Sequence, residues 1–186
     1  MKQSLLYILC LCFSSFTVHA TFIPSDEFIQ YHVQVAMEEV EDEDIFNLIQ
    51  ENVNNLDHAG TTNNSAQELI HLIEEGYKID PFNMSKLIEI LRHANASNNA
   101  TTVIVKAIEY DSTITPEHLS TLIRTLGHAN SCANATTIIL KAIEHGVKFG
   151  PKERALLAEM SKIANARGNV EIIRKALHER AMQVKA

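Results

Sequence analysis

The chain has 186 residues, of which 46% are hydrophobic, and it carries 16 Lys plus Arg against 23 Asp plus Glu, a formal net charge of −7. That length suffices for one domain with a continuous core, and the acidic balance argues against nucleic-acid binding, which takes a basic surface. Three cysteines, two of them in the first 20 residues, cannot form a disulfide framework.

The first 20 residues have the pattern of a secretory leader. Lys2 supplies positive charge, apolar or small residues run from Leu5 to Val18, and Ala20 is the small residue expected before a cleavage site. A membrane anchor is the alternative, but this stretch is shorter than the roughly 20 residues that a span needs. We therefore expect residues 1–20 to be removed and the chain to be exported, to the periplasm or the extracellular space, with no transmembrane segment left.

Residues 21–44 are expected to hold a leading helix that ends in an acidic segment, defined here as residues 38–44. This segment places six carboxylates in seven positions: Glu38, Glu39, Glu41, Asp42, Glu43 and Asp44. The range 21–75 contains 13 acidic residues and no Lys or Arg, whereas 152–186 contains 8 basic and 4 acidic residues. The acidic segment is either a solvated linker or a surface that steers a basic partner toward the chain. It lacks the spaced ligands and turn glycine of a calcium loop.

From residue 45 onward the sequence repeats with a period of 35 residues. The run LRHANASNNATTVIVKAIEY, which starts at Leu91, returns as LGHANSCANATTIILKAIEH at Leu126, and an earlier copy starts at Leu56. A fixed period of this length predicts stacked helical hairpins. We expect an all-α solenoid of about four helix-turn-helix repeats, with approximate boundaries at 45–79, 80–114, 115–149 and 150–186.

Each repeat predicts two helices with defined ends. Proline recurs every 35 residues after a residue suited to an N-cap, in the pairs Asp80-Pro81, Thr115-Pro116 and Gly150-Pro151. Asn95 and Asn130 are expected to end the first helices in the left-handed conformation, and Asn98 and Asn134 to cap the second helices. The second helices are expected to end at Gly76, Asp111 and Gly146.

The fourth repeat departs from the others in two ways. Its apolar stripe (Leu156, Leu157, Met160 and Ile163) matches the third repeat at a spacing of 34, which predicts that one residue is lost just after Pro151. Its last helix, from Val170 to about Gln183, is largely polar on one side, as a terminal repeat must be to face water.

The 35-residue period, the residues Leu122, Ile123, Leu126 and Ala129, the pair Ala135 and Ile138, and the closing Gly146-Val147 resemble a pentatricopeptide repeat. The alanine pair Ala135 and Ala142 is equally similar to the tetratricopeptide repeat. The first resemblance implies single-stranded RNA binding by polar side chains near Ser85, Ser120 and the repeat ends. The acidic charge and the leader argue against that use, so nucleic acid is a disfavoured partner.

The first helices carry polar residues that differ between copies on a constant apolar framework. The pairs are Lys86 and Thr121, Glu89 and Arg124, and Arg92 and Gly127. Such variation is expected of a binding surface on repeats, although drift on a solvated face gives the same pattern. The candidate partner-binding residues are therefore Lys86, Glu89, Arg92, Thr121 and Arg124, together with the acidic segment.

No constellation typical of an enzyme, a cofactor site or a metal site appears in the sequence. His58, His93 and His128 form a column, but neighbouring repeats lie roughly 10 Å apart, too far for adjacent histidines to share one zinc ion. We expect an exported interaction module or scaffold that binds a protein, either in the periplasm or as a secreted factor acting on a host. Pentatricopeptide-like RNA binding is the alternative.

Overall fold

The computed structural model describes residues 43–58 and 60–183, and these residues form eight helices and no strand. The all-α prediction is therefore confirmed. The first helix runs over residues 43–56 and is followed by α3 (Thr62–Glu74), α4 (Pro81–Ile90), α5 (Ser97–Glu109), α6 (Pro116–Thr125), α7 (Cys132–Glu144), α8 (Pro151–Met160) and α9 (Ala164–Gln183). The leading helix predicted over 21–44 lies outside the described residues up to position 42.

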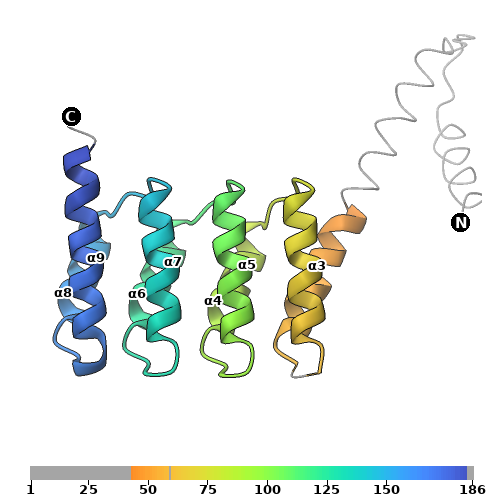
Figure 1. The fold of residues 1–186 in the computed structure, drawn as a ribbon, viewed down its shortest axis with the longest axis horizontal. Coiled ribbons are helices and arrows are strands. Elements are labelled where there is room, and N and C mark those ends of the chain that lie inside the picture. Colours follow the sequence, from red (N-terminus) through yellow and green to blue (C-terminus); the bar gives the residue numbers. More distant parts are fainter. Residues whose placement is uncertain (1–42, 59, 184–186) are drawn as a thin grey trace, which may run out of the picture. The chain divides into compact units, whose positions relative to one another are not determined.

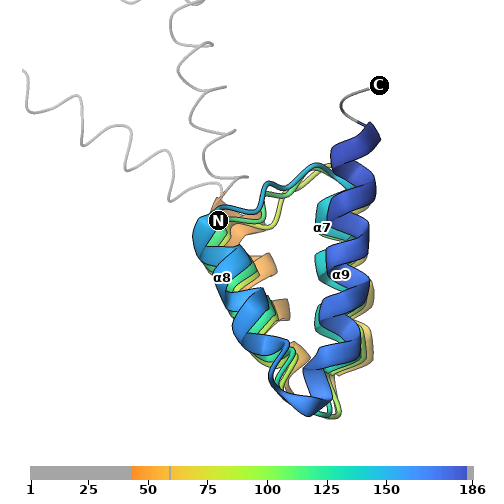
Figure 2. The ribbon, with the colours of Figure 1, turned by 90° about the vertical axis from the view of Figure 1, so that its left-hand side faces the viewer.

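The helices pair as hairpins that stack side by side in two layers (Figures 1 and 2). The second helices α3, α5, α7 and α9 each pack on the next, and the first helices α4, α6 and α8 do the same behind them. Within a hairpin, α4 packs on α5, α6 on α7, and α8 on α9. Each described hairpin thus contacts its neighbours in the stack, which is the arrangement of a helical solenoid.

The first helices begin as the sequence predicts. Asp80 accepts hydrogen bonds from the backbone N–H groups of Phe82 and Asn83 (2.9 and 3.1 Å). Thr115 Oγ1 accepts from the His118 N–H at 3.2 Å. In α4, α6 and α8 alike, proline occupies the first helical position, where its missing N–H costs no hydrogen bond.

The predicted ends of the second helices are also confirmed. Gly76, Asp111 and Gly146 have positive φ angles of 103°, 62° and 84°. The residue after each of them donates its N–H to a carbonyl one turn back, as Val147 does to Ala142 at 2.9 Å. This Schellman motif satisfies carbonyls that a helix end would otherwise leave without partners.

The inter-helix loops differ from the prediction at four asparagines. Asn95 and Asn130 are not left-handed, because Asp111 is the one non-glycine residue with positive φ among the described residues. The chain instead passes through right-handed turns, in which the His93 carbonyl accepts from both Ala96 and Ser97 (3.0 Å each). The second helices therefore begin before Asn98 and Asn134, which lie inside the first turn.

The fourth hairpin keeps the 35-residue register, so the predicted loss of a residue after Pro151 is wrong. Helix α8 starts at Pro151 and spans 10 residues, as α4 and α6 do. The cap at Pro151 fixes which side faces inward, so Leu157 is buried while Leu156 is only partly buried. Helix α9 buries just Ala166, Val170 and Ile173 in 20 residues, consistent with a terminal hairpin.

A continuous core runs between the two layers. Alanines of the second helices such as Ala107 and Ala142 are fully buried and allow neighbouring helices to approach closely. Leucines and isoleucines of the first helices, including Leu87 and Leu122, fill the space between them. Over the residues that the structure describes, no helix is both long and apolar enough to span a membrane.

Candidate protein-interaction site

Three columns of polar contacts join neighbouring hairpins, and they show which surfaces are already engaged. The first column is an asparagine ladder, made of Asn99, Asn134 and Asn169 at 35-residue intervals. Asn134 Nδ2 donates to Ser97 Oγ (2.6 Å) and Asn98 Oδ1 (3.1 Å), and Asn169 Nδ2 lies 2.8 Å from Cys132 Sγ. Asn99 makes the matching bonds to Thr62 and Asn63. Asn98 and Asn134, which were predicted to cap helices, thus bond to each other between hairpins.

Cys132 belongs to this ladder. It is the first residue of α7 and is buried, with 5% of its surface exposed. Burial raises the pKa of its thiol, and the Asn169 amide offsets only part of that rise. The thiol therefore lies inside the stack and is not offered to other chains.

The second column pairs charges along the second helices. Lys106 Nζ lies 2.6 Å from Glu74 Oε1, and Lys141 Nζ lies 2.8 Å from Glu109 and 3.1 Å from Glu144. The hydrogen bond from Lys141 lowers the pKa of Glu109, and the bonds to Glu109 and Glu144 raise the pKa of Lys141. Opposite charges on this face thus form ion pairs between neighbouring repeats.

The third column is buried at the start of the first helices. His118 is 4% exposed, and its Nδ1 accepts the Thr115 N–H at 3.2 Å. The ring proton is therefore on Nε2, which lies 2.9 Å from Ser85 Oγ and 3.0 Å from the Pro81 carbonyl oxygen. Burial is the largest influence on His118 and lowers its pKa.

Glu153 takes the equivalent place one repeat later. It is 5% exposed, and its carboxylate accepts the Gly150 N–H (3.0 Å) and the Ser120 hydroxyl (3.2 Å). Ser85 and Ser120, which the pentatricopeptide resemblance places near the RNA-reading positions, are thus engaged between hairpins. Ser120 is 6% exposed, so little of it can reach a ligand.

Two of the predicted site residues line a cavity of about 350 Å³ between the helix over residues 43–56 and α4. Lys86 Nζ donates to Asn54 Oδ1 at 3.0 Å and lies 4.6 Å from the centre of the Phe82 ring. Glu89 lies three residues further along α4. The full lining consists of Val53, Asn54, Asp57, His58, Lys86, Glu89, Ile90 and His93.

The other predicted residues lie along the same side of the stack. Arg92 follows α4 and is exposed, as is Arg124 on α6. Thr121 is half-buried and donates to the Glu117 carbonyl at 3.0 Å. We call Lys86, Glu89, Arg92, Thr121 and Arg124 the first-helix surface.

The charges of the first-helix surface differ from those of the second helices. In the part of the chain that the structure describes, Glu89, Arg92 and Arg124 have no ion pair or side-chain hydrogen bond. At the start of the stack, Glu43 and Asp44 are exposed. The rest of the acidic segment, Glu38, Glu39, Glu41 and Asp42, lies outside the described residues.

The histidine column follows the first helices as expected, but one contact was missed. His93 bonds through Nδ1 to Asp57 of the preceding hairpin. His93 and His58 both line the cavity. In the described ranges, no three His, Cys, Asp or Glu side chains are grouped so as to hold a metal ion.

The cavity has a rim of both charge signs, formed by Lys86, Asp57 and Glu89, above buried Val53 and Ile90. Comparison with known proteins gives no further guide, since no protein-family model, curated protein or solved structure matches this chain.

Proposed function

We propose that this chain is an exported protein-interaction module or scaffold that binds its partner through the first-helix surface and the acidic segment. One observation carries the proposal: among the described residues, charges are paired across the second helices but Glu89, Arg92 and Arg124 have no ion-pair partner. A partner that meets paired charges must displace existing bonds, whereas unpaired charges can form new ones. The first helices are therefore the side where binding gains most.

The partner is basic where it meets the acidic segment. The range 21–75 has 13 acidic residues and no Lys or Arg, so it attracts positive charge over distances of about a Debye length, roughly 10 Å at 0.1 M salt. Such attraction raises association rates more than it lowers dissociation rates. Burial of Ser120 and the net charge of −7 both oppose single-stranded RNA as the ligand.

The experiment is a pull-down with residues 21–186, followed by association rates against salt concentration for the partner recovered. Replacing the six carboxylates of the acidic segment with amides should slow association and flatten its salt dependence. Glu74, Glu109 and Glu144 serve as the matched control, because these carboxylates belong to the paired column. Their replacement should change the association rate less.

Two variants distinguish a protein ligand from an RNA ligand. If RNA is the ligand, replacing the carboxylates of the acidic segment with amides should strengthen binding, because it removes repulsion from the phosphates. Replacing Lys86, Arg92 and Arg124 with neutral residues should weaken RNA binding and reduce the slope of its salt dependence by about one per lost phosphate contact. If the partner is a basic protein, replacing the carboxylates of the acidic segment with amides should weaken binding. Recovery of RNA with this second pattern would contradict the proposal.

Export is part of the proposal and has its own check. The protein recovered from outside the cytoplasm should begin at Thr21, as N-terminal sequencing would show. In a bacterial source, fractionation then distinguishes a periplasmic scaffold from a secreted factor that acts on a host. Retention of Met1–Ala20 in a cytoplasmic fraction would contradict this part.

A further inference from the structure

A second cavity, of about 310 Å³, lies in the last hairpin between α8 and α9. Its lining places two arginines and a histidine beside aliphatic side chains: Arg154, Leu157, Arg174, Leu177, His178 and Ala181. None of these lining residues is Asp or Glu. In a chain with a net charge of −7, the cavity is thus a local site for an anionic group.

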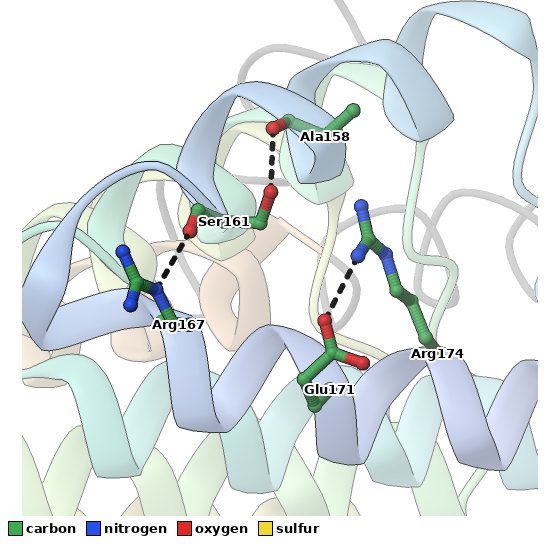
Figure 3. A network of polar contacts seen from close by, with 5 residues as sticks. All are labelled: Ala158, Ser161, Arg167, Glu171 and Arg174. Atoms are coloured by element: carbon green, nitrogen blue, oxygen red, sulfur yellow. Dashed lines mark hydrogen bonds and ion pairs between the residues drawn. The ribbon is translucent and has the colours of Figure 1, made fainter.

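Among the described residues, each arginine is held by one bond, and its other N–H groups have no partner there. Arg154 Nε donates to the Phe149 carbonyl at 3.2 Å. A terminal nitrogen of Arg174 donates to Glu171 at 2.9 Å and forms an ion pair with it, as Figure 3 shows. A guanidinium has five N–H donors, so each retains donors that fit a carboxylate. Leu157 is buried and Leu177 partly buried, which gives the cavity an apolar side as well.

The acidic segment has the matching chemistry within this chain. It places aliphatic Val40 between Glu39 and Glu41, so that a carboxylate lies on either side of an apolar side chain. Two arginines next to leucines complement that pattern in both charge and polarity.

A copy's own acidic segment cannot reach its own cavity. Glu43 begins the described part of the first hairpin, and the cavity is in the fourth, about 30 Å away at roughly 10 Å per packed hairpin. The five residues from Glu38 to Asp42 extend the chain by at most about 18 Å beyond Glu43. Occupation of the cavity by this segment must therefore come from a second molecule.

From these observations we infer that the cavity of the last hairpin binds the acidic segment of a second copy of this chain, head to tail. The inference rests on the proposed function, because it names the basic partner of the acidic segment. It differs from continued stacking of hairpins, since the asparagine ladder ends at α9. The next acceptor position, 35 residues after Cys132, is Arg167, which donates to the Ser161 carbonyl instead (Figure 3).

A head-to-tail contact leaves one free segment and one free cavity in every open assembly, so copies add until a ring closes. Two variants of residues 21–186 test this. The cavity variant carries Arg154→Gln and Arg174→Gln, both at exposed positions. The segment variant carries amides in place of the carboxylates of Glu38, Glu39, Glu41, Asp42, Glu43 and Asp44.

Sedimentation velocity provides the measurement. The wild type should grow in average mass with concentration at about 50 mM salt and return to monomer at about 500 mM, where charges are screened. Each variant alone should stay monomeric. An equal mixture of the two should form a heterodimer and nothing larger, because only one functional segment and one functional cavity can meet.

The matched control is Lys148→Gln with Lys162→Gln, which removes two exposed positive charges outside the cavity and should leave association unchanged. Circular dichroism verifies that every variant keeps its helices. A wild type that is monomeric at all concentrations, association that survives either variant, or a mixture without heterodimer would each overturn the inference.

The outcomes for the two proposals are distinguishable. If the wild type is monomeric but a foreign basic protein needs the acidic segment, the head-to-tail inference fails and the proposed function stands. If copies associate through the cavity while a foreign partner ignores both the acidic segment and the first-helix surface, the proposed function fails and the inference stands.

Discussion

The buried imidazole of His118 makes the stability of the stack depend on pH. Its pKa is lowered chiefly by burial, and the hydrogen bond to the Pro81 carbonyl and the nearby Glu117 oppose this only in part. The unfolded chain therefore binds a proton at higher pH than the folded chain, and the free energy of unfolding falls as pH drops through about 6.5. Protonation of Nδ1 also removes the acceptor of the Thr115 N–H.

His118→Gln should remove this share of the pH dependence. We expect the difference in unfolding free energy between pH 7.5 and pH 5, measured by urea titration, to be smaller in this variant than in the wild type. His128→Gln is the control, because His128 is exposed and makes no side-chain bond within the described residues. Equal pH dependence in the wild type and His118→Gln would show that His118 does not titrate differently on folding.

A single asparagine of the ladder should contribute measurably to the free energy of unfolding. Asn134→Ala removes the donor to Ser97 Oγ and Asn98 Oδ1 and leaves the buried Ser97 hydroxyl without that partner. We expect a loss of about 1 kcal/mol in unfolding free energy. Asn130→Ala, in the exposed loop before α7, should change it by less than about 0.5 kcal/mol. Equal effects at the two positions would show that the ladder adds no stability.

At the scale of the element, the inward face of α6 can be tested by neighbouring substitutions. Leu122 is fully buried, whereas Thr121 is only half-buried. Leu122→Ala should lower the free energy of unfolding by about 2–5 kcal/mol, because it leaves a cavity in a packed core. Thr121→Ala should stay within about 0.5 kcal/mol. A chemical denaturation series checks both, and similar losses would mean that the assigned face is wrong.

Helix ends were predictable from the sequence where a local residue type decides the geometry. Asp80 before Pro81 and glycine at 76 and 146 act through their own side chains or backbone freedom, so spacing alone located them. The loops after the first helices were not predictable in this way. There the backbone satisfies itself through the His93 carbonyl, and the asparagines were recruited to the neighbouring hairpin instead.

The register of α8 shows a second limit. Its apolar residues suggested a shift by one position, but the cap at Pro151 starts α8 35 residues after α6 starts at Pro116, and the ladder contact of Asn169 keeps the same register in α9. The helix then buries Glu153 and satisfies it with Ser120 and the Gly150 N–H. An apolar pattern alone could not predict that a carboxylate would be accommodated inside.

At the scale of the whole molecule, the periodicity predicted the stack and part of the first-helix surface, but not how hairpins meet. Lys86 and Glu89 were identified because they vary between copies. The contacts of Asn54, Asp57 and His93 were missed, because they join residues 32 and 36 positions apart, across the interface of two hairpins. Such contacts depend on the relative placement of repeats, which a single repeat's pattern does not contain.

Stability should be unevenly distributed along the stack, because each hairpin is supported by its neighbours. Helices α5 and α7 are packed on both sides by other second helices, whereas α9 contacts one neighbour in that layer and buries three of its 20 residues. Amide hydrogen exchange should therefore be slowest in α5 and α7 and fastest in the second half of α9, after Ile173. Added salt should speed exchange little, because most of the protection comes from apolar burial and not from exposed ion pairs. Uniform protection from α5 to the end of α9 would instead mean that the described hairpins unfold as one cooperative unit, with the terminal hairpin as firmly held as the centre.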